Sequence, residues 1–400
     1  MWEQIRSNQI RSTVLVAAMG ILLLALGYVL GLYFFNNAVG GMIIALIAWG
    51  IMYLVAYFQG ESILLSISGA RKITRDDHPR LYNIVEEMKI ACGLPKMPDI
   101  YIVDDPAPNA FATGRSPERA SVAVTSGLLQ RLNRDELQGV IGHEMAHIKN
   151  RDVMLMSVAG IILGTIVILA WYATRVLFFS GAGGRRSSKS SGNAQIIILA
   201  VGIVLMIIAP IAAQLLYYAV SRKREYLADA SSALYTRYPE GLASALEKIA
   251  ASTQQLQKVN KATAPMYTVN PFREKGKAAA DLTSTHPPIS QRVKILRAMA
   301  GASEADYEKA YRQVKGGSKG VIPATELALA GKETVSLRAP SAELQGGLDD
   351  TNRARETSDT LWRMGNYRML DCNCGAKIKV PPSIKDPAIK CPRCGRLLRL

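Results

Sequence analysis

The chain has 400 residues, of which 49% are hydrophobic and 20% are charged, and its formal net charge is +16. This mixture indicates a membrane protein with a substantial water-exposed part and excludes a pure channel. A strongly basic chain binds either nucleic acid or anionic lipid headgroups, and the long apolar segments favour lipid.

Two long apolar runs, residues 13–35 and 38–58, lie close to the N-terminus and are separated by two asparagines. Each run is long enough to cross a hydrocarbon core of about 30 Å, and the first is too long for a signal peptide. We therefore predict a retained membrane hairpin over residues 1–60. Basic residues flank both outer ends but not the turn, which places both ends in the cytoplasm.

A loop and a strand follow at residues 104–125. The loop leads into Asn109, Ala110 and Phe111, and the apolar strand candidate is Val122–Thr125. An edge strand here would pair with an extended peptide through main-chain hydrogen bonds, and Asn109 would orient the peptide backbone. From composition alone, the segment is an ordinary loop and strand.

The motif His143-Glu144-Met145-Ala146-His147 lies in a segment that should be helical. Asn133 followed by Glu136 resembles a capping box, and apolar residues then recur at helical spacing. Residues i and i+4 share a helix face, so both imidazoles reach one zinc ion at about 2.0–2.1 Å. Glu144 lies beside the metal, where it takes a proton from zinc-bound water. The motif leaves the third ligand open.

Two further apolar runs, residues 154–176 and 196–220, surround a Gly/Ser-rich loop and predict a second membrane hairpin. Basic residues flank its inner ends and also occupy the loop, so a hairpin that does not cross fully is the alternative.

The second hairpin would bring Glu225 to the side of the membrane where His143 and His147 lie, as the third ligand. Asp229 shares a helix face with Glu225, and its carboxylate would accept the second N–H of a ligating imidazole. The alternative is that both carboxylates balance the basic run at residues 222–224 on a solvated face.

His286 precedes two prolines that open an apolar helix. A histidine here is either a helix-start residue without chemical function or a group that stabilises the negative charge of a tetrahedral intermediate. His78, which precedes Pro79 at another helix start, is assigned no function.

Four motifs, in family order, together resemble the HtpX heat-shock membrane proteases: Asn109–Gly114, His143–His147, Ser221–Asp229 and Thr285–Pro287. These proteases are similar to the larger CAAX prenyl proteases and belong to the Glu-zincins. The resemblance covers about residues 1–300. It implies a zinc endopeptidase of the cytoplasmic membrane that degrades misfolded or damaged membrane proteins under stress.

The four apolar runs and the resemblance together predict a mainly α membrane protein with four transmembrane helices and a zincin-like α+β cytoplasmic protease domain over residues 61–300. In the family pattern His143, His147 and Glu225 bind the catalytic zinc, and Glu144 is the catalytic base. The resemblance favours the catalytic reading of His286.

It also favours substrate binding by Asn109, Ala110 and Phe111, through likeness to the Asn-Ala-Phe segments of related zinc proteases.

The chain changes character after residue 300. Residues 301–370 are mostly polar and are predicted to form a flexible linker. Residues 371–400 contain two cysteine pairs, each followed by glycine, which predict a small β zinc ribbon with a structural zinc: Cys372, Cys374, Cys391 and Cys394. A redox pair is the alternative, and Cys92 is read as a buried apolar group.

The ribbon carries three arginines, but no aromatic residues accompany them, so we predict a protein partner for it rather than nucleic acid. The expected partners of the whole chain are unfolded or membrane-protein substrates and the lipid bilayer. Both termini and the active site are expected to face the cytoplasm. Two other functions compete: a catalytically silent scaffold with structural zinc, and a membrane-tethered nucleic-acid binder.

Overall fold

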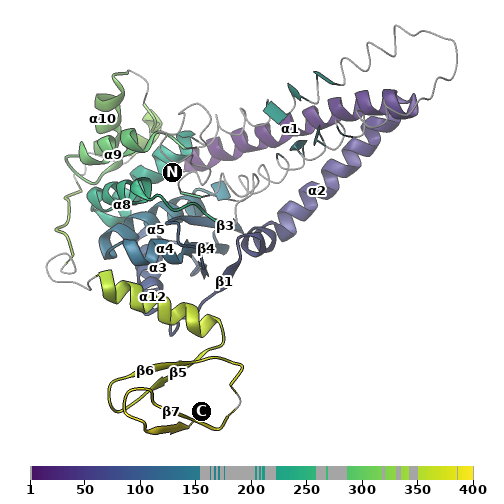
Figure 1. Ribbon diagram of the computed structural model, residues 1–400. Helices are drawn as coiled ribbons and strands as arrows, with labels where there is room; N and C mark the ends of the chain where they lie inside the picture. The colour runs from purple at the N-terminus through teal and green to yellow at the C-terminus, as the bar shows by residue number, and fades with distance from the viewer. Residues whose placement is uncertain are drawn as a thin grey trace.

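The computed structural model consists of a projecting pair of helices, an α+β body and a small C-terminal β unit (Figure 1). The structure describes residues 2–153, 163, 166–167, 170–171, 175, 203–204, 207–208, 210–211, 222–257, 267–268, 286–317, 320–329, 335–341, 350–384 and 386–399.

The projecting arm is a helical hairpin of α1 (Trp2–Phe35) and α2 (Ala38–Ile67). The helices approach closely at their glycines, since a Cβ at Gly41 would lie 2.2 Å from the Gly27 carbonyl oxygen. Asn37 caps α2 by accepting a hydrogen bond from the Gly40 N–H. The predicted hairpin is thus present, and both helices extend beyond the apolar runs.

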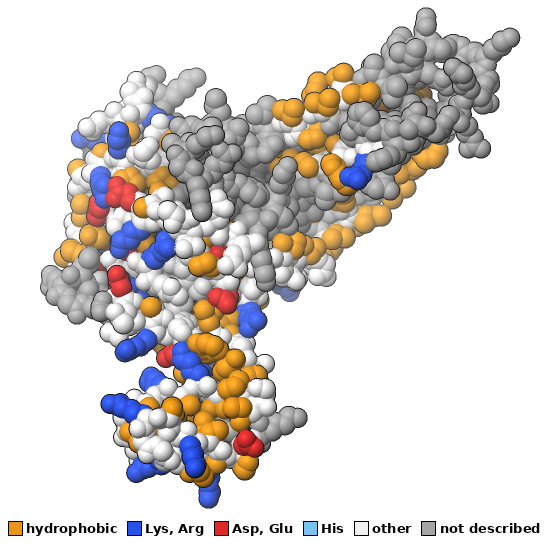
Figure 2. Space-filling view, in the orientation of Figure 1, with side chains coloured by type: hydrophobic (Ala, Val, Ile, Leu, Met, Phe, Trp, Pro, Cys, Tyr) orange, Lys and Arg blue, Asp and Glu red, His pale blue; other side chains and the backbone are white. Residues whose placement is uncertain are grey.

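The arm is coated with exposed apolar side chains, which Figure 2 shows along its length. By length and composition, α2 can cross a membrane, and α1 contains a shorter apolar stretch, Val16–Leu32. The predicted third and fourth membrane helices lie largely outside the described residues and stay a prediction. Of the third run, Leu163 and Ile166 are buried in the cluster that contains Met19.

The body is built on a four-stranded sheet in the order β1-β2-β4-β3. Its strands are β1 (Ala70–Lys72), β2 (Asp99–Val103), β3 (Ala110–Ser116) and β4 (Arg119–Thr125). The strand predicted at residues 122–125 is therefore interior, and the edge strands are β1 and β3. The alternation of side chains between two buried faces explains why β4 reads as a continuous apolar run.

Helices cover the sheet and provide most of the core (Figure 1). They are α3 (Pro79–Cys92), α4 (Ser126–Arg131), α5 (Arg134–Lys149), the helical segment 222–236, α8 (Pro239–Ala251) and α9 (Ile289–Arg297). The capping box predicted for Asn133 and Glu136 is present at the start of α5. Gly139 lets α5 approach α8, because a Cβ there would lie 2.6 Å from the Leu242 nitrogen.

The prediction of a flexible linker over residues 301–370 is wrong for much of its length. It contains α10 (Glu304–Lys315), α11 (Ala324–Leu329) and α12 (Asp350–Met364). These helices are polar overall, but they contact the body through a few apolar or hydrogen-bonding side chains. The Thr360 hydroxyl, for example, donates to the Asp77 carbonyl over 2.7 Å, while Leu361 and Met364 pack against the core.

The C-terminal unit comprises two short antiparallel hairpins. β5 (Arg368–Asp371) pairs with β6 (Lys377–Val380), and β7 (Ala388–Lys390) pairs with β8 (Leu397–Arg399). The unit contacts α12, where Lys379 Nζ lies 3.0 Å from Asp359 and over the ring of Trp362.

The histidine at the start of α3 makes folding sensitive to acid. His78 is buried, and its Nδ1 accepts a hydrogen bond from the Leu81 N–H over 3.2 Å. Burial, with a smaller effect of Arg80, lowers the pKa of His78 to about 4. Below pH about 6.5 the unfolded chain binds a proton that the folded chain does not. The contribution of neutral His78 to the free energy of unfolding is therefore fully present above pH about 6.5, and it is lost progressively as the pH falls towards 4.

We predict that His78→Asn, which retains a capping acceptor, reduces this acid sensitivity. Tm would be measured at pH 7 and at pH 5 for the parent and the variant, both with zinc. The loss of Tm between the two pH values should be smaller in the variant, and an equal loss would contradict the assignment.

Candidate metal centre and active site

Helix α5 places two imidazoles side by side. His143 Nε2 and His147 Nε2 lie 3.3 Å apart, and their rings are nearly perpendicular. His143 is fully buried, and the side chain of His147 is 16% exposed. The i, i+4 spacing accounts for this, because both side chains lie on the face of α5 that is turned towards the segment 222–236.

Glu225 approaches both imidazoles from the helical segment 222–236. Its Oε2 is 3.4 Å from His143 Nε2, and its Oε1 is 3.5 Å from His147 Nε2. Ligand atoms at the vertices of a tetrahedron around zinc lie about 3.4 Å apart. The three donors therefore fit one zinc ion, and their chemistry of two imidazoles and one carboxylate suits it.

The electrostatics keep Glu225 ionised. Burial alone would raise the pKa of its carboxyl, but His286, His143 and His147 together lower that pKa well below its usual range. The alternative of a solvated charged face is wrong for Glu225 and Asp229, since both are buried.

Each imidazole has a carboxylate at its other nitrogen. Asp229 Oδ1 lies 3.0 Å from His143 Nδ1, as the spacing predicted. Asp152 Oδ2 lies 3.2 Å from His147 Nδ1. Such carboxylates fix the tautomer and orientation of a ligating imidazole. The sequence reasoning missed Asp152, although its position just beyond the end of α5 was a usable signal.

Arg292 was also missed. It lies on α9, has no exposed surface and donates to Asp229 from Nε and Nη2 over 2.8 and 2.6 Å. Its Nη1 is 3.3 Å from Glu225 Oε2. The guanidinium thus compensates two buried carboxylates. No local pattern marks it, because its partners are about 65 residues away in the sequence.

The remaining predicted residues of the centre lie around these groups. Glu144 is buried, and its Oε1 accepts a hydrogen bond from the Thr268 hydroxyl over 2.7 Å. His286 is buried with its Nδ1 2.8 Å from Glu225 Oε2, so it lies beside a candidate metal ligand.

Asn109 precedes the edge strand, and Ala110 and Phe111 begin it. The Asn109 side-chain oxygen accepts the Ala110 N–H over 3.0 Å, which fixes the entry into β3. The side chains of Ala110 and Phe111 point to opposite faces of the sheet, Ala110 into the main core and Phe111 into a second cluster.

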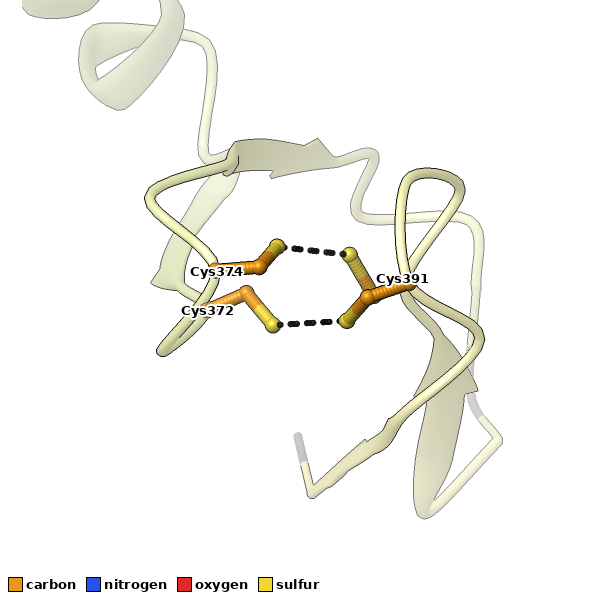
Figure 3. Close-up of side chains that lie close together, drawn as sticks. Cys372, Cys374 and Cys391 are labelled. Atoms are coloured by element: carbon orange, nitrogen blue, oxygen red, sulfur yellow. Dashed lines mark hydrogen bonds between the residues drawn. The ribbon is translucent and has the colours of Figure 1, made fainter.

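The four C-terminal cysteines form a second candidate metal site (Figure 3). Cys372 Sγ lies 3.5 Å from Cys394 Sγ, and Cys374 Sγ lies 3.7 Å from Cys391 Sγ. Four thiolates around zinc are separated by about 3.8 Å, so this set also fits. Gly375 and Gly395 have positive φ, which lets each loop turn around its cysteine pair. Cys92 is buried, as predicted.

We predict that Asp152→Ala lowers the affinity of the His143–His147–Glu225 site for zinc by roughly 10–100-fold, because His147 loses its orienting acceptor. Competition with a chromophoric chelator would measure this affinity. Asp99→Ala, which removes an exposed carboxylate paired with Lys72, is the control and should leave it unchanged. Equal affinities for both variants would contradict the assigned function of Asp152.

Comparisons with known proteins agree with this geometry. Residues 75–300 match the model of peptidase family M48. A protease HtpX homolog of Dictyoglomus turgidum is 46% identical over 298 residues, which span 74% of this chain and 94% of that protein. A protease HtpX homolog of Streptococcus uberis is 39% identical over 299 residues, covering 75% of this chain and 100% of that protein.

Among solved structures, the crystal structure of S. mikatae Ste24p matches this chain with a TM-score of 0.38 and 18% sequence identity. The match covers 73% of this chain and 66% of the Ste24p chain. The family match ends at residue 300, so α10, α11, α12 and the ribbon lie beyond it. The resemblance stated from the sequence motifs is confirmed: the chain belongs to peptidase family M48 and is an HtpX-like metalloprotease.

Proposed function

We propose that this metalloprotease is a zinc endopeptidase of the cytoplasmic membrane that hydrolyses peptide bonds of misfolded or damaged membrane proteins at the cytoplasmic face. The observation that carries the proposal is a largely buried donor set of His143, His147 and Glu225, with Glu144 buried directly after His143 in the same helix. A purely structural zinc site has no need of a carboxylate base next to its ligands.

His143, His147 and Glu225 would hold the zinc ion, which when bound supplies the Lewis acid that activates water and polarises a peptide carbonyl. Glu144 is placed to accept a proton from the attacking water and to pass it to the leaving amine. His286, close to Glu225 Oε2, is placed to stabilise negative charge on the carbonyl oxygen. Asp229 and Asp152 hold the imidazoles.

The edge strand β3 is the proposed docking site for an extended substrate. The Asn109 carbonyl accepts the Thr125 N–H over 3.0 Å, so the next carbonyl, that of Ala110, points away from β4. A peptide laid along this edge would run past Glu144 and the metal ligands. This favours unfolded segments as substrates, because only an extended main chain can add to a strand.

The membrane location rests on the arm. Many of its apolar side chains are exposed, among them Ile21, Ile43 and Phe58, and α2 is long enough to cross a bilayer. The basic residues that flank the hairpin favour a cytoplasmic position for the body and both termini. The third and fourth helices would complete a multi-pass anchor.

For the ribbon we propose a structural zinc held by its four thiolates, and a protein partner or substrate as its ligand. The unit is too small to fold on an apolar core, so the metal would stabilise it. Its separation from the arm by the body leaves its surface accessible from the cytoplasm (Figure 1).

Glu144→Gln tests the proposed chemistry. The variant should bind zinc normally but cleave an unfolded membrane-protein substrate at least roughly 100-fold more slowly, because an amide cannot accept the proton. Purified protein with added zinc, with and without a chelator, would be assayed by gel. Glu247→Gln, which alters an exposed carboxylate on α8, should behave as the parent. Undiminished cleavage by Glu144→Gln would refute the assignment of the base.

Metal content tests the two zinc sites separately. Glu225→Ala should reduce the zinc bound per chain from about two ions to one, because three ligands and their charge balance are needed at the catalytic site but not at the ribbon. Cys374→Ser should remove the other ion. Elemental analysis after extensive dialysis would measure both, and a Glu225→Ala protein that keeps two ions would exclude Glu225 as a ligand.

A further inference from the structure

A two-residue piece of the chain, Tyr267 and Thr268, lies on the outer edge of β3. The Thr268 N–H donates to the Ala110 carbonyl over 2.9 Å. This carbonyl points away from β4, as the Asn109–Thr125 hydrogen bond requires. Thr268 therefore uses the main-chain acceptor that an added strand would use closest to the metal centre.

Thr268 also reaches the catalytic groups. Its hydroxyl oxygen lies 2.7 Å from Glu144 Oε1 and 3.0 Å from the Ala110 carbonyl oxygen. Its own carbonyl accepts a hydrogen bond from Arg292 Nη1 over 3.4 Å. A residue with its N–H on the edge strand and its side chain on the base occupies space that a scissile peptide needs.

Tyr267 anchors this piece on the other face of the sheet. Its side chain is 1% exposed, and its ring meets Phe111 edge to face at a centroid distance of 5.1 Å. The same cluster contains Leu65, Val103 and Ala123. Its hydroxyl donates to Ser68 Oγ over 3.4 Å. These residues form a cradle around the Tyr267 ring. The cradle is apolar along its walls and polar at its end, which suits the aromatic side chain of a tyrosine.

We propose that Tyr267 and Thr268 hold the place of a substrate strand, so that a substrate must displace them to reach the metal. The inference rests on the proposed docking of substrates at β3. It follows that the cradle of Tyr267, once vacated, receives a substrate side chain, and that a peptide with an aromatic residue at this position competes best. The resting protein is thereby protected from cleaving chains that bind weakly.

Peptide binding to the zinc-loaded Glu144→Gln protein tests this without cleavage. The probe is a fluorescent unfolded peptide with one central phenylalanine, and a second peptide has alanine there. Introducing Tyr267→Ala should tighten binding of the phenylalanine peptide roughly tenfold, because the internal competitor loses its anchor. Thr268→Pro, which removes the N–H donor, should act in the same direction. The alanine peptide should gain less from Tyr267→Ala.

Two conservative variants serve as controls. Tyr267→Phe keeps the ring and Thr268→Ser keeps both donors, so neither should change Kd more than about twofold. Zinc content should match the parent in every variant, and Tm should match it in these two controls. Unchanged or weaker peptide binding in both Tyr267→Ala and Thr268→Pro would overturn the inference. Failure of every protein, the parent included, to bind either peptide would instead overturn docking at β3, and the inference with it.

Discussion

The structure depends on keeping a buried carboxylate, Glu225, charged beside two imidazoles. An unpaired charge in a protein interior costs several kcal/mol, so its surroundings have to compensate it. Arg292 contacts both Glu225 and Asp229, and Asp229 in turn contacts His143. Helix α5, the segment 222–236 and α9 therefore have to meet at one point, and α8, which packs against both α5 and α9, holds them together.

The sheet contributes an edge strand, β3, to the candidate active site. Its interior strands β2 and β4 are apolar on both faces, and β3 lies at an edge of the sheet. An open edge beside a hydrolytic centre invites nonspecific strand addition. Pairing by Thr268 covers this edge at Ala110 with the protein's own chain, which opposes such addition there.

Much of this could be predicted from the sequence, because the informative patterns are local. The helical spacing of His143 and His147 and the Asn133–Glu136 box specify α5, and the length of the apolar runs specifies the hairpin. Arg292 and Thr268 were out of reach, since Asp229 and Glu144, to which they donate, are more than 60 residues away and only the tertiary fold joins them. The linker was misjudged because α10 and α12 are polar helices whose buried faces consist of a few residues, such as Tyr307 and Thr360.

Helix α12 fixes the position of the C-terminal ribbon relative to the body. It lies across the start of α3 and the end of α4. Arg363 donates a hydrogen bond to the Asp76 carbonyl, and Arg353 donates one to the Gln130 carbonyl. The ribbon is thus fixed at the end of the molecule opposite to the tip of the arm (Figure 1). A large protein bound to the ribbon would therefore lie on the far side of the body from the tip of the arm, and its size would not obstruct the surroundings of the arm.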